Sequence, residues 1–428
     1  MKNKILLTIG LISGLTLFNS CRETEEITEE PPVVTPEEPE RQDYEDLSAE
    51  EMANCYIVQS EGSYKFKADN QFNLGEGLPV PPQISPKSAE LLWQTSNGSI
   101  TNVELITEDN LPYVAFEVKQ PKGNAVVAVF NEDKEIEWSW HIWMPEEEVA
   151  SVSSASGYDV MNLNLGALNN TAGDPRSYGM LYQWGRKDPF PAAATLTGDT
   201  ETMSAPMFDG SGKIVTITHS DWSDASGNTI EYAISHPTVC LSNYGQYSVS
   251  RDWLSLSCSD DSLWGNPEGG YRDSSTNSYP NKGRKTCYDP SPAGWRVPPV
   301  DVFRHFTTTG GYVWTFEDFN VEDINRDGKT DLNDYKYGWY FMIDNETSLY
   351  FPAAARFDGS YGMLMGSVSG IWGNYWSNSP YSGMSGGAIS VLAFQVKDQS
   401  GNDMTTVSPS GAASRADAYS IRCIRDNK

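Results

Sequence analysis

The sequence predicts a mainly β fold, of the all-β or α+β class, and three observations support this. The chain is rich in Gly, Ser, Asn, Tyr and Trp, its apolar runs are short, and few segments have helical periodicity. This composition is typical of extracellular β proteins. Residues 136–144, "IEWSWHIWM", alternate with a period of two, as a strand does. One face of that strand is apolar throughout: Ile136, Trp138, Trp140, Ile142 and Met144.

Length and charge limit the classes of function. A chain of 428 residues is too long for one compact core, so we expect two or three domains. The formal net charge is −28, from 58 acidic and 30 basic side chains. Because the phosphates of a nucleic acid would be repelled by this charge, nucleic acid is excluded as a partner.

The N-terminus predicts secretion. Lys2 and Lys4 precede the apolar run "ILLTIGLISGLTLF", and "NSC" follows it, which is the order of a signal peptide over residues 1–21. The run is too short to span a bilayer comfortably. A Cys directly after small residues resembles a bacterial lipobox, with Cys21 as the lipidated first residue. Phe18, three residues before Cys21, departs from the Leu that is usual at this position of a lipobox. An ordinary cleaved signal peptide is the alternative.

Residues 22–50 predict a disordered tether. The stretch 22–51 holds 13 Asp and Glu against 2 Arg, and it is also rich in Pro. "CRETEEITEE" resembles the acidic export tags that send Bacteroidetes lipoproteins to the outside of the outer membrane. A solvated linker is the alternative. We therefore expect an outer-membrane lipoprotein, lipid-anchored and facing the cell exterior.

Short β-type runs between turns occupy residues 51–146 and predict a small Ig-like β-sandwich. The second face of the strand 136–144 carries Glu137, Ser139, His141 and Trp143. Trp143 has two interpretations, a platform for a sugar ring or a cover for a contact between domains. After a polar joint, residues 147–428 form one long irregular module with Gly-, Asn- and Ser-rich loops, in which "VDVFRHFTTTGG" predicts a short helix.

The stretch "DINRDGKTDLND", residues 323–334, predicts a calcium loop. An EF-hand-type loop supplies oxygen ligands at positions 1, 3, 5, 7, 9 and 12, with Gly at position 6 for the sharp turn. Gly328 occupies the turn position, and Lys329 would offer its backbone carbonyl. The complete set is Asp323, Asn325, Asp327, Lys329, Asp331 and Asp334.

This loop resembles the repeat of dockerin modules, but it differs in occurring once and in carrying Thr330 where Val or Ile is usual. A strand-like run, "KYGWYFMI", follows it instead of a helix. Since docking needs the paired repeat, we expect one structural Ca²⁺ that rigidifies a long loop. An Asp-rich turn without metal is the alternative.

The cysteines predict an oxidising compartment. Five remain besides Cys21, so at least one is unpaired or pairs with another chain. Cys240 and Cys258 are close in sequence and suit a local disulfide, and a bond between Cys287 and Cys423 would close the C-terminal module. Cys55 is then left over. Spacing alone does not decide these pairings.

Several distinctive motifs follow one another along the chain: "YQWGRKDPFP" (182–191), "ISHPTVCL" (234–241), "KTCYDPSPAGWRVPPVDVF" (285–303), "YFPAAARFDGS" (350–360), "YWSNSPY" (375–381) and "YSIRCIRD" (419–426). This set resembles the major paralogous domain of Fibrobacter and Bacteroidetes surface lipoproteins, which is C-type-lectin-like. The runs of residues 51–146 are similar to the N-terminal sandwich of the same proteins. The resemblance implies non-catalytic roles in adhesion or in fimbria-like assemblies.

The chain departs from that family at two motifs. Ser291 stands where the family has Cys, with Cys287 four residues earlier, which implies that a disulfide to Cys423 is displaced. "MNLNLGA" replaces "MDRNLGA", so Asn162 and Leu163 stand where the family has an Asp–Arg pair. A C-type-lectin-like fold does not by itself imply sugar binding. The Glu-Pro-Asn loop of calcium-dependent lectins is absent from the sequence.

No catalytic motif stands out, so we expect a protein that is not an enzyme, with an unrecognised hydrolase as a weaker alternative. Four rings in "GIWGNYWSNSPYSG" are candidates for stacking on a ligand: Trp372, Tyr375, Trp376 and Tyr381. The alternative is that they fill the core.

The sequence therefore predicts a cell-surface lipoprotein in adhesion, or a fimbria-associated protein at a tip or anchor position. The second hypothesis is a glycan-binding lipoprotein of a polysaccharide-uptake system. The expected partners are the outer membrane, through the lipid, and either pilin subunits or host and environmental glycans or proteins.

Overall fold

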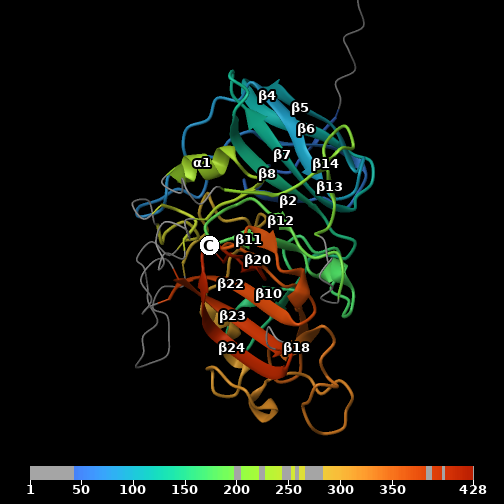
Figure 1. The fold of residues 1–428 in the computed structure, drawn as a ribbon. Helices are drawn as coiled ribbons and strands as arrows, with labels where there is room; N and C mark the ends of the chain where they lie inside the picture. The colour runs from blue at the N-terminus through green and yellow to red at the C-terminus, as the bar shows by residue number, and fades with distance from the viewer. Residues whose placement is uncertain are drawn as a thin grey trace, which may run out of the picture. The chain divides into compact units, whose positions relative to one another are not determined.

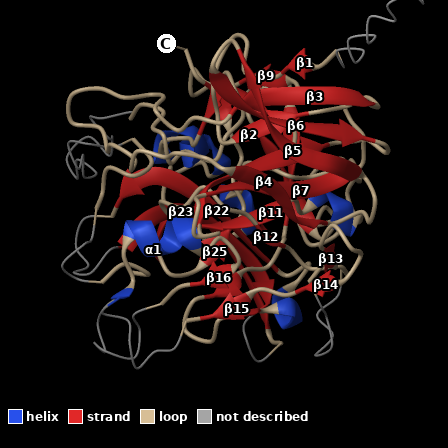
Figure 2. Ribbon diagram, turned by 90° about the horizontal axis from the view of Figure 1, so that it is seen from above, coloured by secondary structure: helices blue, strands red, loops and turns tan. Residues whose placement is uncertain are grey.

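The computed structural model describes residues 43–196, 204–220, 227–242, 252–255, 260–265, 283–381, 388–397 and 401–427. Cys21, the segment 22–42 and Cys258 lie outside these residues. The described chain is mostly β, as predicted, and strands dominate Figure 2. No described helix is long and apolar enough to cross a membrane.

Two sheets build the N-terminal part, which is blue to teal in Figure 1. The four-stranded sheet has the order β1 (Glu45–Asp46), β3 (Gly62–Lys67), β6 (Leu111–Val118) and β5 (Ile100–Glu108). The six-stranded sheet has the order β14 (Ile214–Val215), β13 (Met207–Phe208), β4 (Ser88–Gln94), β7 (Gly123–Phe130), β8 (Ile136–Met144) and β2 (Cys55–Ile57). A segment from beyond residue 200 thus extends a sheet of the N-terminal part.

The ordered chain begins earlier than the predicted end of the tether at residue 50. Strand β1 pairs in parallel with β3, and Leu47 packs against the main core. Ser48 is buried, and its hydroxyl accepts a hydrogen bond from the Lys67 backbone N–H at 2.9 Å. Residues 43–50 are therefore part of the fold, because these contacts hold them to the first sheet.

Among the described residues, the C-terminal part contains five further sheets. One four-stranded sheet has the order β17 (Trp295–Arg296), β26 (Ile424–Arg425), β10 (Asp159–Met161) and β9 (Ser151–Ser153), and a five-stranded sheet has the order β12 (Phe190–Pro191), β11 (Met180–Gln183), β25 (Ala418–Tyr419), β20 (Phe357–Asp358) and β21 (Met363–Leu364). Two strand pairs are β15 (Thr218–His219) with β16 (Val239–Cys240), and β18 (Gly338–Met342) with β19 (Ser348–Pro352). The fifth sheet has the order β22 (Trp372–Pro380), β23 (Ala388–Lys397) and β24 (Asp403–Ser414). Helical segments are short: α1 (Ile230–Ser235) and the 3₁₀ turns η1 (Pro175–Ser177), η4 (Val300–Phe306), η5 (Phe316–Asp318) and η6 (Gly366–Val368).

The predicted helix in "VDVFRHFTTTGG" is the 3₁₀ segment η4. Val302, Phe303 and Phe306 are buried in a second core, where the rings of Phe306 and Phe341 stack with centroids 4.3 Å apart. This aromatic core fixes η4 beneath the sheet β22–β23–β24.

Strand β8 confirms the alternation read from the sequence, but its second face is not exposed. Ser139, His141 and Trp143 are all buried, because they bond to residues between 167 and 188. The Ser139 hydroxyl donates to Asp188 at 2.6 Å, and the Trp143 indole N–H donates to the Ala167 carbonyl at 2.7 Å. Trp143 therefore covers an internal contact and is not a sugar platform.

His141 is the centre of a buried chain of hydrogen bonds. Its Nε2 lies 2.8 Å from Asn124 Oδ1, and its Nδ1 lies 3.1 Å from the Tyr182 hydroxyl. Since the Asn124 amide nitrogen donates to the Gly166 carbonyl, Nε2 carries the proton and Nδ1 accepts from Tyr182. Burial lowers the pKa of His141 to about 3, so the ring is neutral.

A second set of contacts joins the start of β2 to the segment 287–292. The Asn54 amide donates to the carbonyls of Cys287 (2.7 Å) and Asp289 (2.9 Å) and accepts from the Trp138 indole (3.0 Å). Such contacts place Asp43–Lys428 in one compact unit, and its largest hydrophobic core draws residues from both parts of the chain.

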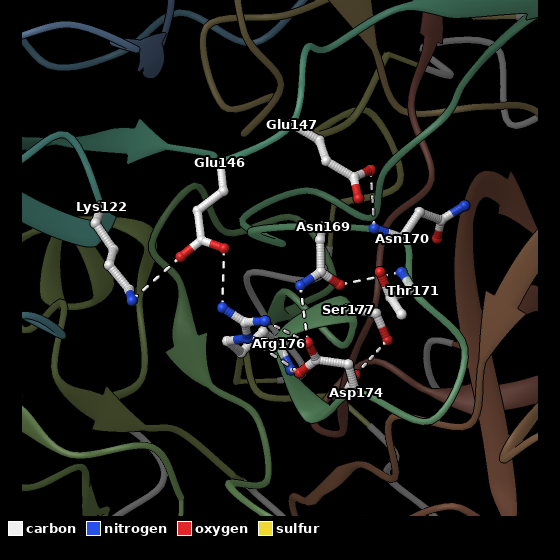
Figure 3. Close-up of polar contacts among 9 residues, drawn as sticks. All are labelled: Lys122, Glu146, Glu147, Asn169, Asn170, Thr171, Asp174, Arg176 and Ser177. Atoms are coloured by element: carbon white, nitrogen blue, oxygen red, sulfur yellow. Dashed lines mark hydrogen bonds and ion pairs between the residues drawn. The ribbon is translucent and has the colours of Figure 1, made fainter.

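An ion-pair network at the surface joins the end of β8 and the turn before β7 to residues 174–176 (Figure 3). Arg176 lies 2.8 Å from Glu146, which follows β8, and 2.7 Å from Asp174. Lys122, in the turn before β7, lies 3.2 Å from the other oxygen of Glu146. Burial acts to raise the pKa of Asp174, but hydrogen bonds from Arg176 and Asn169 outweigh it, so the pKa is lowered. Since Lys122 and Arg176 are exposed to solvent, the network contributes little stability.

Candidate calcium site and binding surface

The candidate calcium loop, residues 323–334, leaves from and returns to the pair β18–β19. Val321 pairs with Phe341 just before the loop, and the Glu322 N–H donates to the Tyr340 carbonyl at 2.8 Å. After the loop, the Tyr335 hydroxyl donates to the Gly370 carbonyl at 3.0 Å, and β18 begins at Gly338. The loop therefore starts beside β18 and leads into it, and the strand that the run "KYGWYFMI" predicted follows the loop in place of a helix.

The first half of the loop has the turn that the sequence predicted. The Asp323 carboxylate accepts from the backbone N–H groups of Asp327 (3.2 Å) and Gly328 (2.8 Å), and Asn325 Oδ1 accepts from the Asp327 N–H at 2.8 Å. Gly328 has φ +87°, and a Cβ there would meet no atom within 4 Å. Glycine is therefore favoured at this position by backbone conformation and not by crowding.

The second half is held by one buried carboxylate. Asp334 Oδ1 accepts from the N–H groups of Ile324 (3.0 Å) and Asn325 (3.3 Å), and its Oδ2 accepts from the Asp331 N–H at 3.1 Å. Position 12 thus ties the start of the loop to its end.

Lys329 supplies positive charge to the same loop. Its ammonium lies 2.8 Å from Asp331 and 3.8 Å from Asp327. The hydrogen bond to Asp331 raises the pKa of Lys329, and the same bond lowers the pKa of Asp331. A cation bound in the loop would compete with this ammonium for the two carboxylates.

The donor types and their order fit calcium, which prefers hard oxygen ligands. Besides the carboxylates, the predicted set includes the Asn325 amide oxygen and the Lys329 carbonyl. The carboxylates now face backbone N–H groups, and within the described ranges no three His, Cys, Asp or Glu side chains converge as metal ligands. Calcium therefore stays a prediction about this loop.

The end of the loop forms one wall of a pocket of about 450 Å³, which we call the loop-side pocket. Leu332 belongs to the loop itself, and Tyr335, Lys336 and Tyr337 follow it directly. The facing wall comes from the chain before β22 and from the end of β23 and start of β24: Ser369, Gly370, Ile371, Val396, Lys397 and Asp403. On the side of the loop, the Tyr335 ring packs against the buried ring of Trp339, with centroids 4.9 Å apart.

The structure corrects the prediction of ligand-contacting rings at Tyr375 and Trp376. Both are fully buried in β22, where the Tyr375 hydroxyl donates to the Pro352 carbonyl and the Trp376 indole to the Tyr182 carbonyl. Trp372 is half-buried, and its indole donates to the Lys397 carbonyl at 2.8 Å. Tyr381 is half-buried at the end of a described range. The central part of the Gly/Ser-rich stretch is a buried strand, so Tyr375 and Trp376 fill the core.

The structure also corrects the expected bond between Cys287 and Cys423. Both thiols are free and buried, as are those of Cys55 and Cys240. Cys287 Sγ faces the Pro79 carbonyl at 3.5 Å, and Cys423 Sγ lies 3.2 Å from Ser291 Oγ. The position where the resembling family has Cys therefore does face Cys423, and Cys287 does not replace it. Of the pair Cys240 and Cys258, Cys240 is described and its thiol is free, and Cys258 lies outside the described residues.

Tyr312 and Trp314 form an exposed aromatic pair that the motifs in the sequence did not predict. Their exposed fractions are 51% and 69%. The alternation in "GYVWTF", with a buried Val313 between two rings, is the signal that would have found them.

Comparison with known proteins gives no match: no protein-family model, curated protein or solved structure matches the chain.

Proposed function

We propose that the protein is a non-catalytic, lipid-anchored surface protein that acts in adhesion, or in a fimbria-like assembly as a tip or anchor subunit. Cys21 would carry the lipid, and the acidic segment after it would extend the folded unit from the outer membrane. The signal sequence, the Cys after small residues and the acidic, Pro-rich composition of residues 22–42 support this.

The observation that carries the proposal is the position of the candidate calcium loop beside the loop-side pocket. Leu332 lies inside the loop and also lines the pocket. A Ca²⁺ held by the six predicted residues would stiffen that wall, and a stiff wall loses less conformational entropy when a partner binds. The ion would therefore be structural and would act on adhesion through the pocket.

The second proposed function is glycan capture for polysaccharide uptake. It needs exposed rings, and the burial of Tyr375 and Trp376 removes two of the four rings first considered. Glycan capture therefore depends on another aromatic surface.

The test compares intact cells that carry the wild-type chain, a Cys21→Ala variant or a Leu332→Asp variant. Protease added outside the cells should degrade the wild-type protein, and Cys21→Ala should release it from the membrane fraction. Leu332→Asp should remain displayed and reduce retention of the cells on a mucin-coated surface. Protein that survives until lysis, or unchanged retention with Leu332→Asp, would contradict the proposal.

A further inference from the structure

Tyr312 and Trp314 form an exposed aromatic surface on one extended segment. Their ring centroids are 5.8 Å apart, at an interplanar angle of 51°. Val313 between them is buried and exchanges backbone hydrogen bonds with Val407 of β24, at 2.9 and 3.0 Å. The two rings therefore project to the same side of a segment that is fixed to the sheet.

The loop that carries these rings is braced from within. The Asp318 carboxylate accepts from the hydroxyls of Thr308 (2.9 Å) and Thr315 (2.7 Å), and the Thr308 N–H donates to the Asp318 carbonyl at 2.9 Å. These hydroxyl bonds lower the pKa of Asp318, so the carboxylate stays charged. The segment that carries the aromatic pair is thus braced in the absence of a ligand.

A polar pocket of about 460 Å³ opens on the same loop, and we call it the threonine pocket. Its lining includes Ser156, Asp301, Arg304, Thr308, Thr309 and Gly310. Gly310 lines the pocket and precedes Tyr312 by two residues, so the pocket lining and the two rings lie on the same loop.

The hydroxyls of the threonine pocket have defined directions. Thr308 Oγ1 donates to Asp318, which leaves its lone pairs for a ligand donor. Thr309 Oγ1 accepts from the Gly311 N–H at 3.2 Å, which leaves its proton for a ligand acceptor. Both side chains are exposed. The charges lining the pocket balance in part, since Arg304 lies 3.9 Å from Asp301.

We infer that the aromatic pair and the threonine pocket together form a binding site for a neutral saccharide. The apolar face of a sugar ring would pack on Trp314 and Tyr312, which supply rigid apolar area. Sugar hydroxyls, which both donate and accept, match the directed hydroxyls of Thr308 and Thr309. The chain's net charge of −28 disfavours anionic saccharides. This site rests on the second proposed function, glycan capture, and lies on residues other than the candidate calcium loop.

The test probes the unit Asp43–Lys428 with an array of neutral oligosaccharides of glucose, galactose, mannose and N-acetylglucosamine, and with sialylated and sulfated counterparts. The strongest binder is then titrated into protein labelled with 5-fluorotryptophan. Loss of one ¹⁹F resonance in Trp314→Phe assigns Trp314. We expect that resonance to shift on binding, and Trp314→Ala to weaken binding on the order of tenfold.

Tyr361→Ala is the matched control, because Tyr361 is 66% exposed and lies outside this site. It should leave binding unchanged, and Trp314→Phe should retain most of it. This site is overturned if Trp314→Ala still binds the saccharide and the Trp314 resonance of the wild-type protein does not shift on binding. That result would leave glycan capture standing. Absence of any saccharide binding by the wild-type protein overturns both proposals. Binding of only the charged saccharides overturns the neutral-saccharide site and leaves glycan capture standing.

Discussion

Ser291 and Cys423 face each other in the interior, with Oγ and Sγ 3.2 Å apart, although 132 positions separate them in the chain. We predict that Ser291→Cys forms a disulfide with Cys423 under oxidising conditions. A bond that closes so long a loop stabilises by about 2 to 4 kcal/mol in typical cases. The measurement is the melting temperature with and without reductant, together with a count of free thiols after denaturation.

Ser291→Ala is the control for this change, because it removes the hydroxyl without offering a second sulfur. Its melting temperature should not respond to reductant. Two alkylatable thiols at positions 291 and 423 in the oxidised, denatured variant would show that the two side chains do not meet as described.

His141 predicts a loss of stability in acid. Its pKa is lowered from 6.5 to about 3 by burial, so the unfolded state binds more protons between these values. The contribution of the neutral ring is complete above pH 6.5 and is lost as the pH falls toward 3. For this group alone we expect about 2 to 3 kcal/mol less unfolding free energy at pH 4.5 than at pH 7.

His141→Gln separates this effect from the titration of carboxylates. The Gln amide can still donate to Asn124 but does not titrate in this range. Urea unfolding at several pH values should therefore show a shallower loss of stability in the variant. Parallel curves for the two proteins would mean that His141 is not buried as a neutral base.

At the scale of elements, Gly328 gives a prediction for the candidate calcium loop. With φ +87° and open space around it, an added side chain meets only the conformational penalty. Gly328→Ala should cost about 1 kcal/mol of unfolding free energy, and Gly328→Asn should cost less, because Asn tolerates this conformation. Urea unfolding measures both variants. Equal costs for Ala and Asn would indicate a steric cause instead.

The sequence predicted elements well where the signal was local. The alternation of residues 136–144 identified β8, and the spacing in residues 323–334 identified the turn at Gly328. The burial of the second face of β8 could not be predicted, because Ser139 and His141 are residue types that are common at surfaces. Their partners, Asp188 and Tyr182, come from a distant part of the chain, and no local pattern reports them.

The prediction that Tyr375 and Trp376 contact a ligand was wrong for a related reason. Gly and Ser around Tyr375 and Trp376 resemble a loop, yet these residues form β22, which pairs with β23 and lies between packed layers. Small residues there make room for large rings: a Cβ on Gly373 would come within 2.1 Å of the Phe394 ring. Composition alone does not distinguish this packing from an exposed loop.

At the scale of the whole molecule, the contacts of Asn54 predict cooperative unfolding of Asp43–Lys428. Asn54→Ala would remove a donor to two carbonyls and an acceptor for Trp138, all buried. We expect a loss of roughly 3 kcal/mol, because buried polar groups lose their partners. Calorimetry should show one transition in the wild type and one, at lower temperature, in the variant.

Asn131→Ala, in an exposed turn after β7, is the control and should change the transition little. Two separate transitions in Asn54→Ala would show that the N-terminal part and the C-terminal part unfold independently. That result would favour the two-module division expected from the sequence over a single folded unit.

Calcium binding by the unit Asp43–Lys428 tests the central claim most directly. Isothermal titration and thermal unfolding should be run with the wild type, Asp323→Ala and Asp344→Ala; the last removes an exposed turn carboxylate outside the loop. We predict one Ca²⁺ per chain and a stability gain of about 2.7 kcal/mol at one hundred times Kd. Asp323→Ala should abolish both, and Asp344→Ala should keep both. Absence of binding in the wild type, or unchanged binding in Asp323→Ala, would contradict the account.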